Sequence, residues 1–184
     1  MDPHRRPRDG WSRAQRWLHW TVAGLVLAGF AVGLVMVALP LTLLLEKILA
    51  YQAHKTIGLL VPPLVAWRLW LRARRGRPAE EEDIPAWQRR AAGLGHAALY
   101  ALLLVVPALG YLSASTAPGQ IETVLFLLIP VPHVLEPDEA LYERLRGLHG
   151  ALAWTLVLLA AGHAAAALHH HRRGRRVLAR MLGR

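Results

Sequence analysis

Apolar residues form four long runs along the 184-residue chain, separated by polar and charged segments. The runs cover about residues 17–39, 48–71, 91–112 and 148–168, and a helix needs ~20 residues to cross ~30 Å of hydrocarbon. A soluble bundle would carry a polar stripe along each helix, whereas the stretch Thr21–Leu39, TVAGLVLAGFAVGLVMVAL, has none. The pattern predicts an all-α fold, an integral membrane four-helix bundle.

The first and second runs each have an unusual feature. The first is longer than the apolar region of a typical signal peptide, and no small-x-small cleavage motif follows it, so we expect it to remain as a helix. The second is interrupted near its ends by polar and charged residues, namely Gln52, His54, Lys55 and Arg68.

Composition agrees with a membrane protein that has basic tails. Hydrophobic residues make up 54% of the chain and charged residues 18%. The lack of cysteine excludes disulfides, thiolate zinc sites, iron–sulfur clusters and covalently attached c-type haem. A net charge of +10 is also typical of nucleic-acid binding, but the distribution of the charges favours a membrane topology, and we expect no nucleic-acid partner.

Basic residues alternate along the connections, as the positive-inside rule requires for an even number of spans. Three segments are rich in arginine: Arg5, Arg6, Arg8, Arg13 and Arg16; Arg72, Arg74, Arg75, Arg77, Arg89 and Arg90; Arg172, Arg173, Arg175, Arg176, Arg180 and Arg184. The other two connections hold only Lys47, Arg144 and Arg146, and the acidic run Glu80–Asp83 has little weight in the rule. We therefore expect cytoplasmic tails at 1–16 and 169–184 and a domain at 17–168 in a bacterial inner membrane.

The third connection, about residues 113–147, is long for a bundle loop. Its segment IETVLFLLIPVPHV is apolar but too short to span before Pro130 and Pro132. An interfacial helix or a lid on the outer face is expected there, with a plain amphipathic connector as the alternative.

Histidines supply the candidate chemistry, because ionisable residues inside spans are rare and usually functional. In the predicted topology His19 lies near the cytoplasmic side and His54 near the outer side. His149 and His163 are 14 residues apart, which is about 21 Å and ~40° short of four helical turns. They share one face, so depth pairs His19 with His163 and His54 with His149.

Two stacked histidine pairs in a helix bundle are what two b-type haems with bis-imidazole ligation need. The alternative for any single buried histidine is a hydrogen-bonded structural role. One zinc or copper site cannot contain both His149 and His163, because ~21 Å separates them.

Basic residues near each pair suit the haem propionates, with ordinary snorkelling to the interface as the alternative. Lys55 and Arg146 are the candidates on the outer side, and Arg16 and Arg68 on the inner side. Small residues would let a flat macrocycle approach the backbone, namely Gly58, Gly147, Gly150, Gly162 and Ala164–Ala167.

Five motifs together resemble the bacterial di-haem cytochrome b561 family, the group that includes a membrane superoxide oxidase. They are RWLHW at 16–20, HKTIGLL at 54–60, GLGHAALYALLLVVPALGY at 93–111, LHGALAW at 148–154 and GHAAAALHHH at 162–171. The resemblance implies a four-helix bundle with His19, His54, His149 and His163 as axial ligands. It also implies a quinone site near the inner haem, which places His170 and His96 as candidates beside it.

The expected function is electron transfer across the inner membrane between an outer-side donor, with superoxide as one candidate, and membrane quinone. In this expectation the electron passes from the outer haem to the inner haem. Lys47, Lys55 and Arg146 would attract an anion, and the acidic residues of the third connection oppose that attraction.

Two alternatives stay open. One is a cytochrome b subunit that anchors a periplasmic hydrogenase or dehydrogenase. The other is a haem-free membrane scaffold or transporter.

Overall fold

The computed structural model describes residues 10–76, 78 and 84–183. The predicted charges at Arg5, Arg6, Arg8, Arg77, Arg184 and Glu80–Asp83 therefore lie outside the described residues. The described chain is mostly helical. Its elements are α1 (Arg13–Ala38), the 3-10 turn η1 (Leu41–Leu43), α2 (Leu44–Arg75), α3 (Ala86–Thr116), the strands β1 (Thr123–Leu125) and β2 (Ile129–Val131), α4 (Glu139–Arg172) and α5 (Val177–Leu182).

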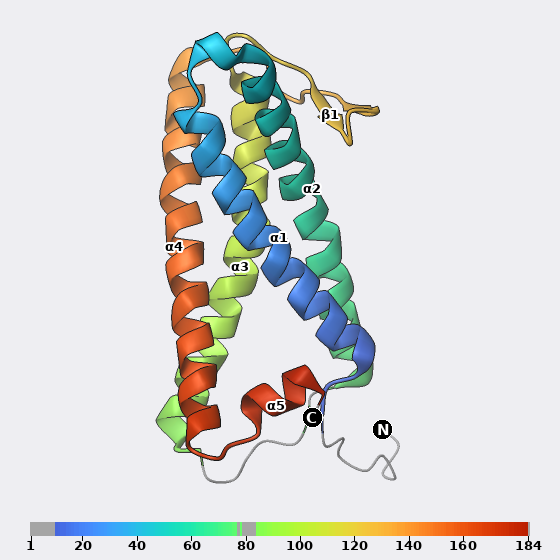
Figure 1. Ribbon diagram of the computed structural model, residues 1–184, viewed down its shortest axis with the longest axis vertical. Coiled ribbons are helices and arrows are strands. Elements are labelled where there is room, and N and C mark those ends of the chain that lie inside the picture. Colours follow the sequence, from blue (N-terminus) through green and yellow to red (C-terminus); the bar gives the residue numbers. More distant parts are fainter. Residues whose placement is uncertain (1–9, 77, 79–83, 184) are drawn as a thin grey trace.

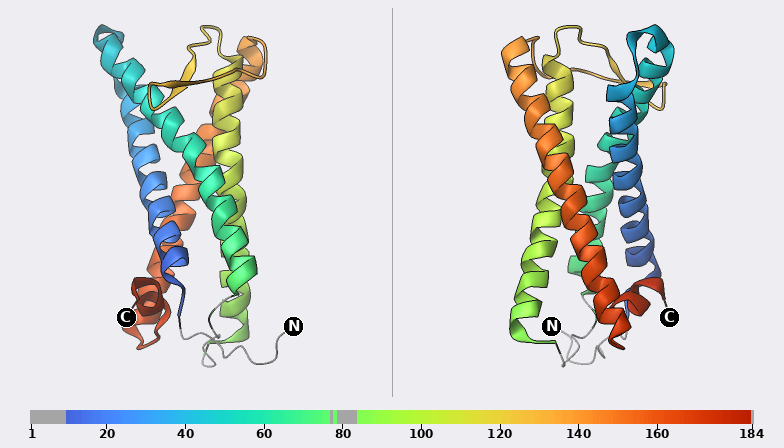
Figure 2. Two further views of the ribbon diagram at one scale, coloured as in Figure 1. Left: turned by 90° about the vertical axis from the view of Figure 1, so that its right-hand side faces the viewer. Right: turned by 60° about the vertical axis from the view of Figure 1, so that its left-hand side comes forward.

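Four long helices run along the longest axis of the molecule (Figure 1). α1 packs mainly on α2 and α3 mainly on α4, while α2 and α3 make the larger contact between the two pairs. The hairpin β1–β2 and η1 lie at one end, and α5 lies at the other, as both views of Figure 2 show. We call these the hairpin end and the basic end.

Three of the described helices, α1, α3 and α4, are long and apolar enough to cross a membrane by length and composition. α2 is 32 residues long but is not among them. It contains the polar residues that interrupt the second apolar run, and the contacts of these residues are described below.

Large apolar side chains point outward along the helices. Leu27, Leu34, Val37 and Leu158 are between 49% and 67% exposed. The buried core is small by comparison, and its cluster consists of Val22, Val61, Val65, Leu103, Val106 and Leu156. A surface this apolar is unfavourable in water over several helices and is what lipid requires.

Polar contacts hold the helix ends together. Ser12 and Gln15 form a capping box at the start of α1, and Gln15 Nε2 donates to Gly76 O at the end of α2 (3.4 Å). At the other end Lys47 Nζ donates to Met36 O and Leu39 O, which satisfies carbonyls that end α1 without a helical partner. Asp138 N donates to Thr116 O, so that α4 begins where α3 ends.

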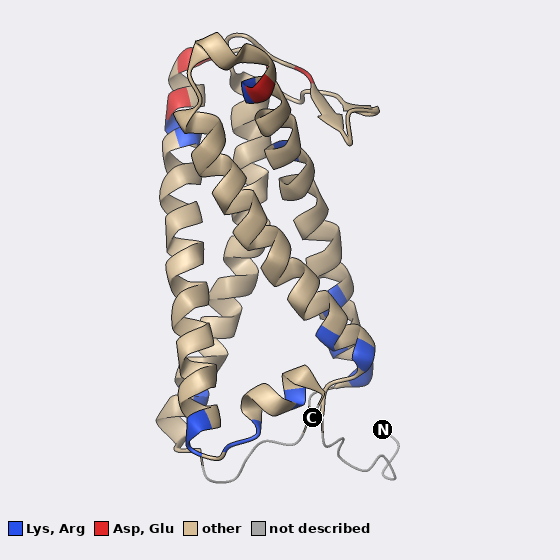
Figure 3. Cartoon of the chain, viewed as in Figure 1, with Lys and Arg blue, Asp and Glu red and all other residues tan. Residues whose placement is uncertain are grey.

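The described lysines and arginines gather mostly at the basic end, and the described acidic residues lie at the hairpin end (Figure 3). The arginine-rich segments that the sequence groups on one side of the membrane therefore lie at one end of the molecule. The predicted tail at 169–184 is structured in part, because α4 continues to Arg172 and α5 follows it. Trp20 Nε1 donates to Met181 O (3.2 Å) and attaches α5 to α1.

The prediction of an interfacial helix in the third connection is wrong. Residues 123–131 form an antiparallel hairpin in which Thr123 pairs with Val131 and Leu125 with Ile129. Pro130 and Pro132 oppose a helix, and Phe126 and Leu127 adopt positive φ angles of 53° and 59° at the turn. Such angles are uncommon for bulky residues, and the turn keeps them through the pairing of its strands and through contacts with α2.

Candidate functional site

Four histidines from α1, α2 and α4 lie together as two pairs. The ring centres of His54 and His149 are 5.9 Å apart near the hairpin end. Those of His19 and His163 are 6.3 Å apart near the basic end. These are the pairs that the depth argument predicts, although their role as haem ligands remains a prediction.

The His54 ring lies against α1. Its Nδ1 is 2.9 Å from Gly29 O, and a Cβ atom on Gly33 would lie only 3.1 Å from His54 Cε1. Since a carbonyl oxygen only accepts hydrogen bonds, Nδ1 must carry the proton. The ring therefore reaches across one glycine to the carbonyl group of the preceding helical turn.

The His149 ring repeats this arrangement on α3. Its Nδ1 is 2.9 Å from Val106 O, and a Cβ atom on Gly110 would lie 2.9 Å from His149 Cε1. Both Nδ1 atoms are thus occupied by hydrogen bonds, which leaves the two Nε2 atoms available. Histidines that bind metals are commonly oriented in this way by a backbone acceptor on the other ring nitrogen.

The basic-end pair has a different environment. His19 Nδ1 is buried and has no hydrogen-bond partner within the described part of the chain. The ring of His96, from α3, lies 5.1 Å from that of His163, and the charge of Arg68 acts on both His19 and His163. A histidine from a third helix and a half-buried arginine thus replace the glycine contacts of the other pair.

The spacing of both pairs fits a haem between them. Two imidazoles on opposite sides of a metal place each nitrogen about 2 Å from it, so their ring centres lie about 6 Å apart. The described residues contain no group of three or more His, Cys, Asp or Glu side chains suited to a metal ion, whereas haem takes only two protein ligands. Imidazole nitrogens are the donors that b-type haem iron uses, and in the hairpin-end pair the hydrogen-bonded Nδ1 atoms leave Nε2 for the metal.

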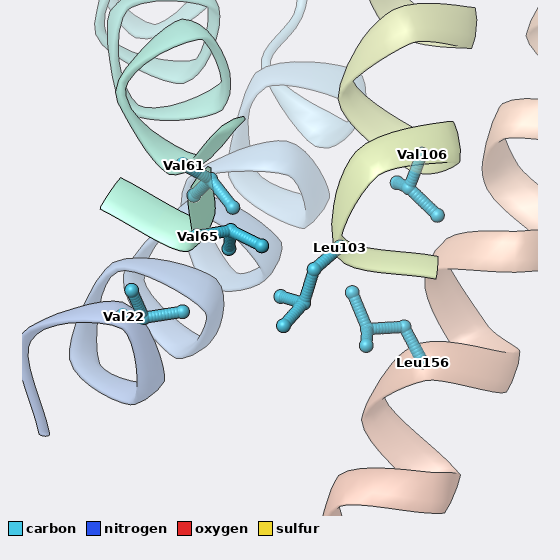
Figure 4. Close-up of a cluster of buried hydrophobic side chains, with 6 residues drawn as sticks. All are labelled: Val22, Val61, Val65, Leu103, Val106 and Leu156. Carbon is cyan, nitrogen blue, oxygen red and sulfur yellow. The ribbon is translucent and has the colours of Figure 1, made fainter. Parts of the chain in front are cut away.

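A cluster of buried apolar side chains lies among the four long helices (Figure 4). Val22, Val61 and Val65 enter it from one side, and Leu103, Val106 and Leu156 from the other. Leu156 is seven residues from both His149 and His163, which is about 10 Å along α4 in each direction. Leu156 places this apolar cluster between the two pairs, which are about 21 Å apart in total along α4.

The four predicted propionate partners differ in the contacts that they make. Lys55 Nζ donates to Ile121 O (2.9 Å) in the third connection, and Arg146 forms a 2.7 Å ion pair with Glu143. The guanidinium of Arg16 packs so closely on Gly183 that a side chain there would collide with it. Arg68 lies over the Tyr100 ring at 5.6 Å and is the one of the four that acts electrostatically on a histidine pair.

The two histidines predicted near a quinone separate in the structure. His96 contacts the basic-end pair directly, whereas His170 lies two turns beyond His163 along α4 and is 2.9 Å from Arg175 Nη1. A small pocket at the same end is lined by Trp11, Gln15, Arg68, Arg72, Tyr100 and Met181. It combines an aromatic wall with hydrogen-bond donors.

Comparison with known proteins decides the family. The family model described as prokaryotic cytochrome b561 matches residues 10–184. The chain belongs to this family. The cytochrome b561 homolog 2 of Escherichia coli K12 is 36% identical over 146 residues, which cover 79% of this chain and 76% of the relative. Homolog 1 of the same organism is 30% identical over 158 residues, covering 83% and 85%.

Membership of the cytochrome b561 family confirms the resemblance found in the sequence. This membership makes the protein a membrane protein that binds b-type haem and transfers electrons. The haem-free scaffold or transporter disagrees with this membership and is set aside.

Sequence reasoning missed the glycines that pack on the histidine rings. It considered Gly58, Gly147, Gly150 and Gly162, where a Cβ atom would meet no neighbouring atom within 4 Å. The glycines in contact are Gly33 and Gly110. One signal was present, because Gly29 and Gly33 form the G-x-x-x-G spacing that lets membrane helices approach closely.

Proposed function

We propose that this cytochrome b561 binds two b-type haems and transfers electrons across the bacterial inner membrane, between a donor on the outer side and quinone in the membrane. Four helices, α2 included, would cross the membrane with both termini in the cytoplasm. The single observation that carries the proposal is the presence of two histidine pairs at two depths of one helix assembly.

The topology is supported by the distribution of charge. The described arginines gather at the basic end, which the positive-inside rule assigns to the cytoplasm. The basic-end pair, His19 and His163, is then the inner site, and His54 with His149 is the outer site. The central domain at 17–168 would lie in the membrane, with basic segments on either side of it.

Bound haem supplies an iron that accepts and releases one electron. The residues of the chain would do the rest: His54, His149, His19 and His163 would hold the iron, and Gly29 O and Val106 O would keep two of the imidazoles oriented. The apolar cluster around Leu156 would keep water away from the space between the sites. The two pairs lie about 21 Å apart along the axis of α4, with Leu156 halfway between them.

The inner side offers the better place for a quinone head group. The pocket beside Arg68 and Tyr100 has hydrogen-bond donors and an aromatic side chain, but it has room for only about one water molecule, so side chains would have to move to admit a quinone ring. His96, in contact with His163, is the histidine placed to hydrogen-bond near the inner site, and His170 is a second candidate further toward the cytoplasm.

Superoxide is the candidate donor. The charges near the outer pair support it less strongly than the histidine pairs support haem binding. Lys55 follows His54 directly in the sequence and donates to Ile121 O. The charge of Arg146 is offset by its ion pair with Glu143, so the attraction for an anion depends mainly on Lys55 and Lys47.

The test has two parts. Pyridine-haemochrome analysis of the purified chain should give two b-type haems per polypeptide, and a value of one or none would contradict the proposal. Superoxide generated on the outer side of proteoliposomes should reduce quinone in the bilayer. Lack of reduction together with co-purification of a redox subunit would favour the hydrogenase or dehydrogenase anchor instead.

A further inference from the structure

The hairpin β1–β2 is fastened to α2 by side chains of the interrupted second run. Gln52 Nε2 donates to Glu122 O (2.6 Å), and Gln52 Oε1 accepts from Val124 N (3.0 Å). Further along α2, Thr56 Oγ1 accepts from Phe126 N (3.3 Å). The polar residues that make α2 less apolar than its neighbours thus satisfy the backbone of the hairpin.

These contacts fix the depth of the hairpin. Its chain passes Gln52 first and reaches Thr56 one helical turn later, so the hairpin descends beside α2 from the hairpin end toward the middle of the molecule (Figure 1). Thr56 is nine residues beyond Lys47, or about 13 Å along the axis. The turn of the hairpin therefore lies near the level of His54.

The hairpin lies on the side of α2 away from His54. At ~100° per residue, Gln52 and Thr56 lie within ~40° of each other, and His54 is ~160° from both. The hairpin is therefore no lid over the His54–His149 pair, which corrects the lid expected from the sequence. Figure 1 shows it on the outside of the helices.

The turn presents apolar side chains to its surroundings. Phe126, Leu127, Leu128 and Ile129 are between 56% and 80% exposed, and residues 123–135 contain no Asp, Glu, Lys or Arg. The backbone of the turn is bonded internally, with Leu128 N donating to Leu125 O at 2.9 Å. Unpaired backbone polar groups are costly in hydrocarbon, and in this turn the N–H groups of Phe126, Leu127 and Leu128 are bonded to Thr56 Oγ1, Val124 O and Leu125 O.

We infer that the hairpin turn, residues 126–129, is a lipid-binding element that inserts beside α2 into the acyl chains of the leaflet at the hairpin end. Its partner is lipid rather than protein because the exposed side chains continue the outward apolar surface of the helices and carry no charge. The inference rests on the proposed membrane topology, in which α2 spans the bilayer.

The natural absence of cysteine allows a clean test by site-directed spin labelling. Leu128→Cys, at the most exposed turn position, is labelled in the full haem-loaded chain in phosphatidylcholine and phosphatidylglycerol vesicles. Power saturation then compares the accessibility of the label to oxygen and to a water-soluble nickel chelate. Leu27→Cys, on the outward face of α1, is the lipid reference. Glu136→Cys, exposed in the same connection, is the aqueous reference.

The Leu128 label should prefer oxygen to nickel, as the Leu27 label does, and the Glu136 label should show the reverse preference. If the Leu128 label prefers nickel to oxygen, as the Glu136 label does, while the Leu27 label prefers oxygen, the inference is overturned and the topology stays intact. A label shielded from both reagents also overturns it and indicates a protein partner. If the Leu27 label is itself aqueous, the proposed topology fails.

The anchoring is tested separately with Gln52→Ala in the Leu128→Cys background. Loss of both Gln52 bonds should increase the mobility of the label and lower its preference for oxygen. The Soret spectrum reports whether the histidine pairs are intact. An unchanged label would contradict the role given to Gln52.

Discussion

The two histidine pairs have nearly the same spacing but are held by different means. The rings of His54 and His149 are fixed by the backbone of neighbouring helices, through glycines that let each ring reach a carbonyl group. His19 and His163 are instead surrounded by side chains, namely Arg68, His96 and Trp20. Backbone contacts change little with redox state or pH, whereas charged and titratable neighbours influence a haem electrostatically. The hairpin-end pair is thus held in a fixed geometry, whereas the basic-end pair has charged and titratable neighbours.

The largest expected effect tests whether the pairs are separate sites. His149→Ala should reduce the haem content from two per chain to one, and His163→Ala should remove the other haem. Low-temperature spectra should show that the two variants retain different haems. His171→Ala, at an exposed position outside both pairs, is the control and should keep two haems. Loss of both haems in either single variant would mean that the sites are interdependent.

The glycine contacts are tested by adding one methyl group. In Gly110→Ala the new Cβ would lie 2.9 Å from His149 Cε1, closer than side chains approach, so the ring or α3 must move. We expect lower occupancy of the outer haem and a changed electron paramagnetic resonance signal from it, with the inner haem unchanged. Gly33→Ala, with 3.1 Å to His54 Cε1, should have a smaller effect.

Gly58→Ala is the matched control, because no atom lies within 4 Å of a Cβ at that position. An equal effect of Gly58→Ala and Gly110→Ala would show that the ring contact is not the cause.

The tuning role of the inner site is tested with Arg68→Gln. A nearby positive charge favours the reduced form of the iron, so its removal should lower the midpoint potential of one haem by some tens of millivolts, where about 59 mV is a factor of ten for one electron. Redox titration should show the other haem unchanged. Arg74→Gln, on the same helix with its charge over Trp70, is the control. Equal shifts of both haems would contradict the difference between the sites.

The smallest expected effect concerns the basic end. Gln15→Leu removes the capping box and the bond to Gly76, which is worth about 1 kcal/mol. Thermal release of the inner haem should begin a few degrees lower. Thr155→Ala, which loses only an exposed bond within α4, should leave this temperature unchanged.

The sequence was informative where one helix or its flanking charges settle the matter. The 14-residue separation of His149 and His163 fixes their relative depth and face through helix geometry alone, and the basic segments indicate which connections share an end. It was misleading for residues 121–134. An apolar run broken by prolines predicts a short helix, whereas the structure has a hairpin there that is supported by Gln52 and Thr56. The assignment of Lys55 to a propionate stays a prediction, and the structure adds that its ammonium group donates to Ile121 O.

From the sequence alone came the helical class, the apolar runs and the histidines that belong together by depth, since these follow from periodicity and composition along one chain. The family came from the resemblance of five motifs in the sequence. The tertiary structure alone decided that Gly33 and Gly110 contact the rings, that His96 joins the basic-end pair, and that the hairpin lies opposite His54. These facts depend on which face of each helix meets its neighbour, and that is set by packing between residues far apart in the chain.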